Sequence, residues 1–167
     1  AQSKYSTEKG LPMLRALFVE YPNDPGSWLV DNAYLFGSDI LVAPLFEEGV
    51  YSRDVYLPPG QWIDYQSKKV YAAGWHKIEA GAVPVVMLVR DGAVIPHIGL
   101  AQSTDEMDWS NLELVVFSAG GTTASGRVCL PEDQQLHDLN MVKKGKAFEL
   151  VKNPLGGKVR WTVRSVR

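Results

Sequence analysis

The sequence predicts a mainly β protein, in which antiparallel β-sandwich domains follow a single strand–helix unit. Two observations carry this prediction. From Tyr51 onward, short β-rich runs alternate with proline and glycine turns, which is typical of a sandwich. Before them, Leu11–Gly49 contains an apolar run, a turn, a helical stretch and a second apolar run. That order is one unit of an α/β design, and it occurs only once in the sequence.

The strand–helix unit comes first in the chain. Leu11–Val19 is apolar except for Arg15, which is the pattern of a strand buried on both faces. The turn residues of Tyr21–Gly26 follow, and they lead into a predicted short helix over Leu29–Phe36. Apolar Ile40–Ala43 then predicts the next strand.

The remaining runs predict strands, and the last of them has the clearest pattern. Val159, Trp161 and Val163 alternate with polar residues, so one face should pack on a core and the other should meet water. Asp91-Gly92 indicates a tight hairpin with positive φ. The predicted strands are Asp54–Leu57, Gln61–Tyr65, Trp75–Glu79, Val85–Arg90, Ala93–Pro96, Leu112–Phe117, Arg127–Leu130, Asp138–Lys143, Ala147–Lys152 and Lys158–Val166.

Composition excludes several classes of partner. The 167 residues include 17 basic and 19 acidic side chains, and these are scattered rather than gathered on one segment, which argues against nucleic acid as a partner. No apolar run approaches the roughly 18 to 20 residues of a membrane span, so we expect no membrane association. The first ten residues indicate no compartment. Cys129, the single cysteine, is expected to be a buried thiol.

Three longer segments carry a family resemblance. Gly37–Pro44, Tyr56–Trp62 and Pro84–Pro96, in this order and spacing, strongly resemble glycoside hydrolase family 31. The resemblance covers most of the chain. It implies a (β/α)8 barrel followed by two β-sandwich domains, in an enzyme that cuts α-linked sugars, here xylosides or glucosides, with retention of configuration.

Three shorter segments indicate a branch of that family. Asn23-Asp24-Pro25, Trp75-His76-Lys77 and Val89-Arg90-Asp91 are more similar to the α-xylosidase branch than to the α-glucosidase branch.

The resemblance also implies that the chemistry lies elsewhere. Retaining hydrolysis needs two carboxyl groups about 5 to 5.5 Å apart, and in this family both are aspartates on middle barrel strands. The Trp-x-Asp-Met-Asn-Glu type of motif that carries the nucleophile does not occur in these 167 residues. We therefore expect no catalytic residue, no cofactor and an inactive C-terminal fragment, whose partner is the missing N-terminal catalytic barrel of the same enzyme.

The same resemblance divides the chain into three parts. Residues 1–39 correspond to a remnant of the last βα unit of the (β/α)8 barrel, residues 40–118 to a proximal β-sandwich, and residues 119–167 to a distal β-sandwich or its first strands. A single βα unit cannot close a barrel, because each strand needs neighbours for its ladder hydrogen bonds.

Two carboxylates are candidates for binding substrate. Glu20 and Asp24 follow the C-terminal end of the predicted barrel strand, which is the side where barrel enzymes place their sites, so in an intact barrel they would line the rim. The simpler interpretation of Asp24 is a turn former within Asn-Asp-Pro-Gly. His76, His97 and His137 show no metal-ligand spacing, and the acidic Asp105, Glu106 and Asp108 match no calcium-loop motif, so no metal site is predicted.

Five tryptophans leave a second function open. Exposed indoles stack on sugars, so a stand-alone carbohydrate-binding module needs no missing part. Against this, Trp161 falls on the predicted core face, and Trp62 and Trp75 lie in strand patterns where burial is common. A purely structural β-sandwich module is the third alternative.

Overall fold

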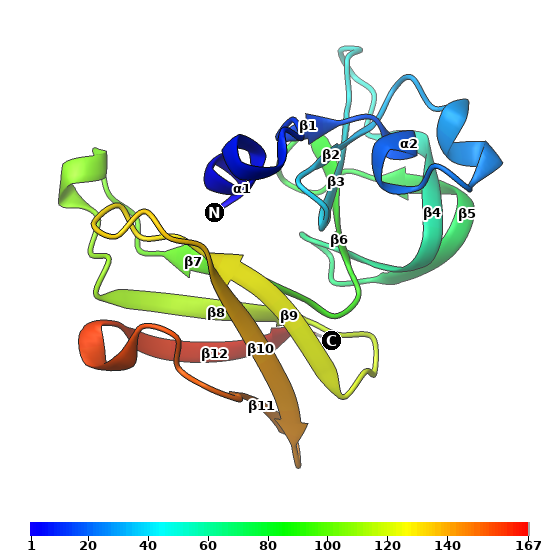
Figure 1. Ribbon diagram of the computed structural model, residues 1–167. Helices are drawn as coiled ribbons and strands as arrows, with labels where there is room; N and C mark the ends of the chain where they lie inside the picture. The colour runs from blue at the N-terminus through cyan, green and yellow to red at the C-terminus, as the bar shows by residue number, and fades with distance from the viewer. Residues whose placement is uncertain (167) are drawn as a thin grey trace. The chain divides into compact units, whose positions relative to one another are not determined.

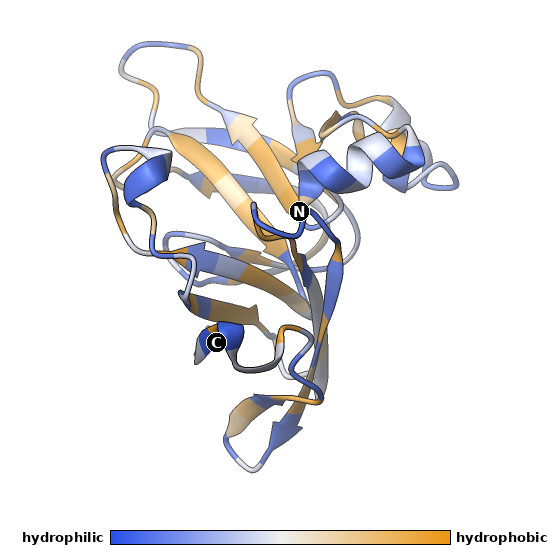
Figure 2. Ribbon diagram, turned by 60° about the vertical axis from the view of Figure 1, so that its left-hand side comes forward, coloured by the Kyte–Doolittle hydropathy of each residue, from blue (hydrophilic) through white to orange (hydrophobic). Residues whose placement is uncertain are grey.

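The computed structural model describes residues 1–166, which form two compact units. One unit comprises residues 10–91. The other joins residues 1–9 to residues 92–166. The chain is mainly β with few helices, so the predicted fold class is confirmed. Figure 2 shows hydrophobic and hydrophilic residues interspersed along many of the strands, as expected where one face of a sheet is buried.

The unit of residues 10–91 is built on one six-stranded antiparallel sheet (Figure 1). The pairing order is β1-β2-β3-β6-β4-β5. Its core gathers fully buried apolar side chains, among them Leu17, Leu35, Leu57, Trp62 and Leu88. The strands are β1 (Leu14–Arg15), β2 (Tyr34–Phe36), β3 (Ile40–Pro44), β4 (Ser52–Asp64), β5 (Val70–Glu79) and β6 (Val85–Arg90).

Strand β4 joins two runs that the sequence separates at Pro58-Pro59-Gly60. Its pairing with β5 shifts register between Leu57 and Gln61, because the prolines have no N–H to donate to the ladder. Gly60 takes a positive φ of 124°, a conformation that glycine adopts without a Cβ clash. The irregularity lets one long strand pass through a segment that cannot pair normally.

The N-terminal part of this unit differs from the prediction in detail. A strand followed by a helix is present, as β1 and the short helix α2 (Leu17–Glu20), but the predicted strand Leu11–Val19 is mostly not extended. The predicted helix over Leu29–Phe36 is wrong. The 3-10 helix η1 (Pro25–Trp28) lies before this range, and the last residues of the range form strand β2. Burial explains the strand, since buried Ala33 and Leu35 alternate with more exposed neighbours at a period of two, and β2 pairs with both β1 and β3.

The second unit is built on a mixed six-stranded sheet with the pairing order β11-β10-β9-β7-β8-β12. β12 runs parallel to β8 and β9 runs parallel to β7, whereas the other pairs are antiparallel. The elements are α1 (Gln2–Lys9), β7 (Ala93–Ile98), η2 (Thr104–Glu106), β8 (Asn111–Phe117), β9 (Thr123–Val128), β10 (His137–Lys144), β11 (Ala147–Leu150), η3 (Gly156–Lys158) and β12 (Arg160–Val166).

Two further predictions are corrected here. Asp91-Gly92 does not close a hairpin, although Gly92 has a positive φ of 77°, because β6 and β7 pair in different sheets. The expected core face of the last strand is only partly covered: Val159 is buried, Trp161 is half-buried and Val163 is exposed. β12 is an edge strand with β8 as its single partner, so alternation alone does not determine its burial.

None of the helices within residues 1–166 is long and apolar enough to cross a membrane.

Candidate functional site

Short elements bring the two predicted site residues together. Glu20 is the last residue of α2, and Asp24 is the N-cap of η1. Residues 20–24, together with Pro59 of β4, line a surface depression of about 290 Å³. The depression therefore gathers two carboxylates, the phenol of Tyr21 and the amide of Asn23.

The Asp24 carboxylate is held by three donors. It accepts hydrogen bonds from the backbone N–H of Ser27 at 3.2 Å and from the Ser27 hydroxyl at 2.6 Å. The Tyr56 hydroxyl of β4 lies 2.9 Å from both carboxylate oxygens. Burial opposes ionisation, but the hydrogen bonds from Ser27 and Tyr56 outweigh it and lower the pKa of Asp24. Asp24 thus has the turn-forming role predicted from Asn-Asp-Pro-Gly, and its role in binding substrate stays a prediction.

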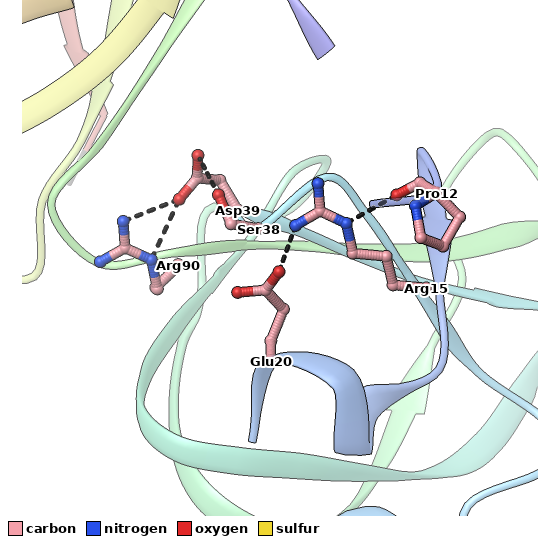
Figure 3. A network of polar contacts seen from close by, with 6 residues as sticks. All are labelled: Pro12, Arg15, Glu20, Ser38, Asp39 and Arg90. Carbon is pink, nitrogen blue, oxygen red and sulfur yellow. Dashed lines mark hydrogen bonds and ion pairs between the residues drawn. The ribbon is translucent and has the colours of Figure 1, made fainter. Parts of the chain in front are cut away.

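Glu20 is held in place by a buried arginine. Arg15 is only 2% exposed, and its guanidinium pairs with the Glu20 carboxylate while Nε donates to the Pro12 carbonyl oxygen at 2.7 Å (Figure 3). A buried charge is tolerated when it is paired and hydrogen-bonded. The single charge that interrupts the apolar run of the sequence therefore orients one of the two candidate carboxylates.

A second ion pair, between Arg90 and Asp39, lies in the same region (Figure 3). Arg90 donates to Asp39 Oδ1 through Nε at 3.0 Å and through Nη2 at 2.7 Å. Both residues act on Tyr21: burial raises the pKa of this phenol, the Arg90 charge opposes that rise, and Glu20 and Asp39 add to it. Tyr21 is therefore a neutral hydroxyl near neutral pH, able to donate and to accept a hydrogen bond.

Sequence reasoning did not find Tyr56, Asp39 or Arg90 as members of this region. Arg90 and Asp39 are 51 residues apart and meet because β3 pairs with β6. Tyr56 reaches Asp24 because its ring packs directly against Gly26. No signal in the sequence ties these positions to Glu20 and Asp24.

Three indoles of the first unit differ sharply in exposure. Trp62 is fully buried, as predicted, and its Nε1 donates to the Pro58 carbonyl oxygen at 3.0 Å. The predicted burial of Trp75 is wrong: it is 60% exposed on β5, where it lies against Tyr56 with ring centroids 5.5 Å apart. Trp28 is also exposed and stacks on Phe18 at 4.6 Å, with an interplanar angle of 13°.

The histidines lie in three separate environments. His76 contacts the Ala72 carbonyl oxygen at 2.8 Å, His97 lies 3.8 Å from Glu113, and His137 lies 2.9 Å from Asp133. Within residues 1–166, no group of three or more histidine, cysteine, aspartate or glutamate side chains is arranged to hold a metal ion.

This geometry suits binding better than acid catalysis. A general acid at neutral pH needs a raised pKa, whereas the pKa of Asp24 is lowered. The Glu20 and Asp24 carboxylates, which are held by their partners, can instead accept hydrogen bonds from sugar hydroxyls.

Comparison with known proteins identifies the family. Residues 10–95 match the glycosyl hydrolase family 31 C-terminal domain. The chain is 32% identical over 143 residues to an α-glucosidase from Hordeum vulgare, covering 80% of this chain and 16% of that protein.

Two solved structures have the same fold. One is a family 31 dextranase from Flavobacterium johnsoniae complexed with glucose, with 25% identity, a TM-score of 0.77, and coverage of 89% of this chain and 20% of that one. The other is a family 31 α-xylosidase from Xanthomonas citri, with 25% identity, a TM-score of 0.72, and coverage of 96% and 19%. The chain thus spans a fifth or less of each of these relatives. By the match over residues 10–95, and with the fold described above, this chain belongs to glycoside hydrolase family 31 and corresponds to its C-terminal portion.

Proposed function

We propose that this chain supports the catalytic (β/α)8 barrel of a retaining α-glycosidase, most like an α-xylosidase, and that the catalytic aspartates lie on the barrel and not on this chain. In this account the partner is the N-terminal catalytic barrel of the same enzyme. The substrates of the whole enzyme are α-linked xylosides or glucosides.

The observation that carries this proposal is a group of exposed apolar side chains within residues 13–36. Within the group, Phe18 stacks on Trp28 and Leu14 is the strand partner of Phe36. Exposed apolar side chains that gather on a folded protein favour an interaction site. The first strand of the segment, β1, also lies at the edge of its sheet. The group, which we call the 13–36 apolar group, consists of Met13, Leu14, Phe18, Trp28, Leu29 and Phe36.

This segment is also the part that the sequence assigns to the barrel. We propose that residues 1–39 are a remnant of the last βα unit of the barrel, that residues 40–118 form the proximal β-sandwich, and that residues 119–167 form the distal β-sandwich or its first strands. Glu20 and Asp24 would then line the rim of the active site, where the depression of about 290 Å³ lies. Docking on the barrel would cover the 13–36 apolar group.

The xyloside preference rests on a smaller set of features. The segments around Asn23, Trp75 and Arg90 resemble the α-xylosidase branch of the family, and the α-xylosidase from Xanthomonas citri is similar over 96% of this chain. A full-length enzyme that carries this chain should therefore hydrolyse p-nitrophenyl α-xyloside faster than the corresponding α-glucoside.

Complementation tests the supporting role. The chain is mixed with the Xanthomonas citri α-xylosidase lacking its matching C-terminal portion, and hydrolysis of p-nitrophenyl α-xyloside is followed. The chain alone should be inactive, and the mixture should be active. The truncated enzyme mixed with its own C-terminal portion is the positive control. Two results would contradict the proposal: hydrolysis by the chain alone, or no hydrolysis by the mixture while the positive control is active.

The exposed aromatics favour a second candidate function, a carbohydrate-binding module. Trp75 is 60% exposed on β5, and the Phe18–Trp28 stack presents a second aromatic face, with Trp28 Nε1 donating to the Pro22 carbonyl oxygen at 2.9 Å. Sugar rings stack on such faces through their C–H groups, while carboxylates and amides bind the hydroxyls.

Tryptophan fluorescence distinguishes this candidate. Titration of the chain with xylose-containing and glucose-containing oligosaccharides should shift the emission if the module binds sugar, and Trp75→Ala or Trp28→Ala should remove the shift. An unchanged spectrum at millimolar ligand would exclude sugar binding by these indoles.

A further inference from the structure

The second unit carries a polar depression that the proposed function does not use. It has a volume of about 290 Å³ and is lined by residues of β7, β8 and β12 together with Gly99. Its polar lining residues are His97, Asn111, Glu113, Arg160 and Thr162.

Sheet register places these side chains on one face. Glu113 is the partner of His97 on β7 and of Thr162 on β12, and Asn111 is the partner of Arg160. Side chains alternate across a strand, and Leu112 and Leu114 of β8 belong to the buried core of the unit, although Leu112 also borders the depression. The polar groups therefore stand together on the opposite face of three adjacent strands.

Glu113 is a fixed, ionised acceptor in this depression. Arg164 binds it through two hydrogen bonds, from Nε to Oε1 at 2.7 Å and from Nη2 to Oε2 at 3.0 Å. The hydrogen bonds from Arg164 lower the pKa of Glu113. Each carboxylate oxygen keeps a second lone pair, which can accept a hydrogen bond from a ligand hydroxyl.

Arg160 contributes a positive charge to this depression. Among residues 1–166, no carboxylate forms a salt bridge with its guanidinium. The nearby Asp108 is satisfied by Ser110 and Asn111: their hydrogen bonds lower the pKa of Asp108, and the charge of Arg160 adds a smaller contribution. Arg160 therefore remains available to an anionic ligand.

We propose that this depression binds a sugar that carries a carboxylate, such as a hexuronate residue. Arg160 would bind the carboxylate through its planar fork of donors, which matches that group in geometry. Glu113, Asn111 and Thr162 would bind the hydroxyls. The negative charge of Glu113 repels a phosphate dianion more strongly than a carboxylate monoanion. Its oxygens accept hydrogen bonds from a ligand rich in hydroxyl donors.

The site is small enough for this class of ligand. Its volume of about 290 Å³ lies just below the roughly 300–1,000 Å³ range of small-molecule pockets, which suits a single sugar residue. The proposal needs no barrel and no hydrolysis, so it does not depend on the proposed function.

Amide chemical-shift titration of the full chain with D-glucuronate tests the proposal, with D-glucose and inorganic phosphate as comparison probes. Glucuronate should perturb the amides around His97, Glu113 and Thr162 and should bind at least tenfold more tightly than glucose. Arg160→Gln should weaken glucuronate binding by roughly tenfold, the usual effect of losing one charged hydrogen-bonding group, and Arg160→Lys should restore part of it. Lys152→Gln, which removes the same charge from another exposed position, should change affinity less than twofold.

Three results would overturn the assignment. Equal affinity for phosphate and glucuronate would make the site a general oxyanion site and not a sugar site. Equal binding of glucuronate by the wild type and by Arg160→Gln would remove the role of the guanidinium. The absence of perturbations around the depression at tens of millimolar glucuronate would exclude the site.

Discussion

The Asp24 carboxylate connects segments that are far apart in the sequence. It caps η1 through Ser27, which is fully buried, and it binds the hydroxyl of Tyr56 on β4. The loop that carries the candidate site is thereby attached to the longest strand of its sheet. We expect small changes at this junction to affect stability measurably.

Removing the Tyr56 hydroxyl tests the junction. Tyr56→Phe should lower the free energy of unfolding by about 1 kcal/mol, the typical net contribution of one hydrogen bond, because a partner of the Asp24 carboxylate is lost. Urea unfolding followed by circular dichroism measures this change. The matched control is Tyr51→Phe, at an exposed tyrosine, which should leave stability unchanged. Equal stability of Tyr56→Phe and wild type would show that the hydrogen bond does not support the loop.

The same carboxyl makes stability depend on pH. Since its pKa is lowered from 3.8 in the folded state, its contribution is fully present above pH 3.8 and is lost as the pH falls through the folded-state pKa. Asp24→Asn should therefore lose less stability than wild type between pH 6 and pH 3, measured by urea midpoints. Parallel curves for the two proteins would contradict this assignment.

Gly26 is required by close contact and not by its backbone angle. A Cβ at this position would lie 2.2 Å from the Tyr56 ring, so the loop or the ring would have to move. Gly26→Ala should destabilise the protein by about 1–3 kcal/mol, as overpacking does. Gly157→Ala is the matched control, because nothing lies within 4 Å of its added Cβ. Thermal melting of the two variants measures the difference. If Gly26→Ala and Gly157→Ala had the same melting temperature, the close contact between Gly26 and the Tyr56 ring would not contribute to stability.

At the scale of elements, β2 connects β1 to the rest of its sheet. It pairs with β1 on one side and with β3 on the other, and its central residue Leu35 is fully buried. Without β2, the two residues of β1 would have no strand partner among the described pairings. We therefore expect Leu35 to be important for holding the N-terminal segment in place.

Leu35→Ala measures this dependence. The cavity left by a fully buried leucine should cost about 2–5 kcal/mol, and hydrogen exchange should speed up at Leu14 and Arg15, which pair with β2. Leu100→Ala, at a fully exposed leucine, is the matched control and should change neither quantity. If Leu35→Ala were destabilised but hydrogen exchange at β1 were unchanged, β1 would not depend on β2 for its place in the sheet.

Most strands could be predicted from the sequence, and the exceptions have a physical cause. Val85–Arg90 and Leu112–Phe117 are apolar runs bounded by turn residues, and they form β6 and β8. The segment over residues 29–36 could not be predicted, because only pairing with β1 and β3 makes its end extended. Local pattern gives the period of a buried strand, but it does not show which neighbours complete the sheet.

The candidate site was predictable only in part. Glu20 and Asp24 could be found because they follow an apolar run that resembles a barrel strand, and they do line one depression. Tyr56, Asp39 and Arg90 could not, because pairing of distant strands and packing against Gly26 bring them there. Exposure of Trp75 was missed for a related reason: it lies on β5, an edge strand whose single partner is β4.

At the scale of the whole molecule, the chain combines two well-packed units with an exposed apolar segment. Each unit has its own core, so each has the buried surface that a folded body needs. The 13–36 apolar group stands outside both cores, with Leu29 81% exposed. In our account this surface is completed by the catalytic barrel.

The most direct test of that account is to measure association of the chain with the truncated Xanthomonas citri α-xylosidase by analytical ultracentrifugation. We predict that wild type and Leu100→Ser bind, and that Phe18→Ser and Leu29→Ser bind at least tenfold more weakly. If the variants at residues 18 and 29 bound as tightly as Leu100→Ser, or if the wild-type chain failed to bind while the enzyme's own C-terminal portion did, the 13–36 apolar group would not be the surface that supports the barrel.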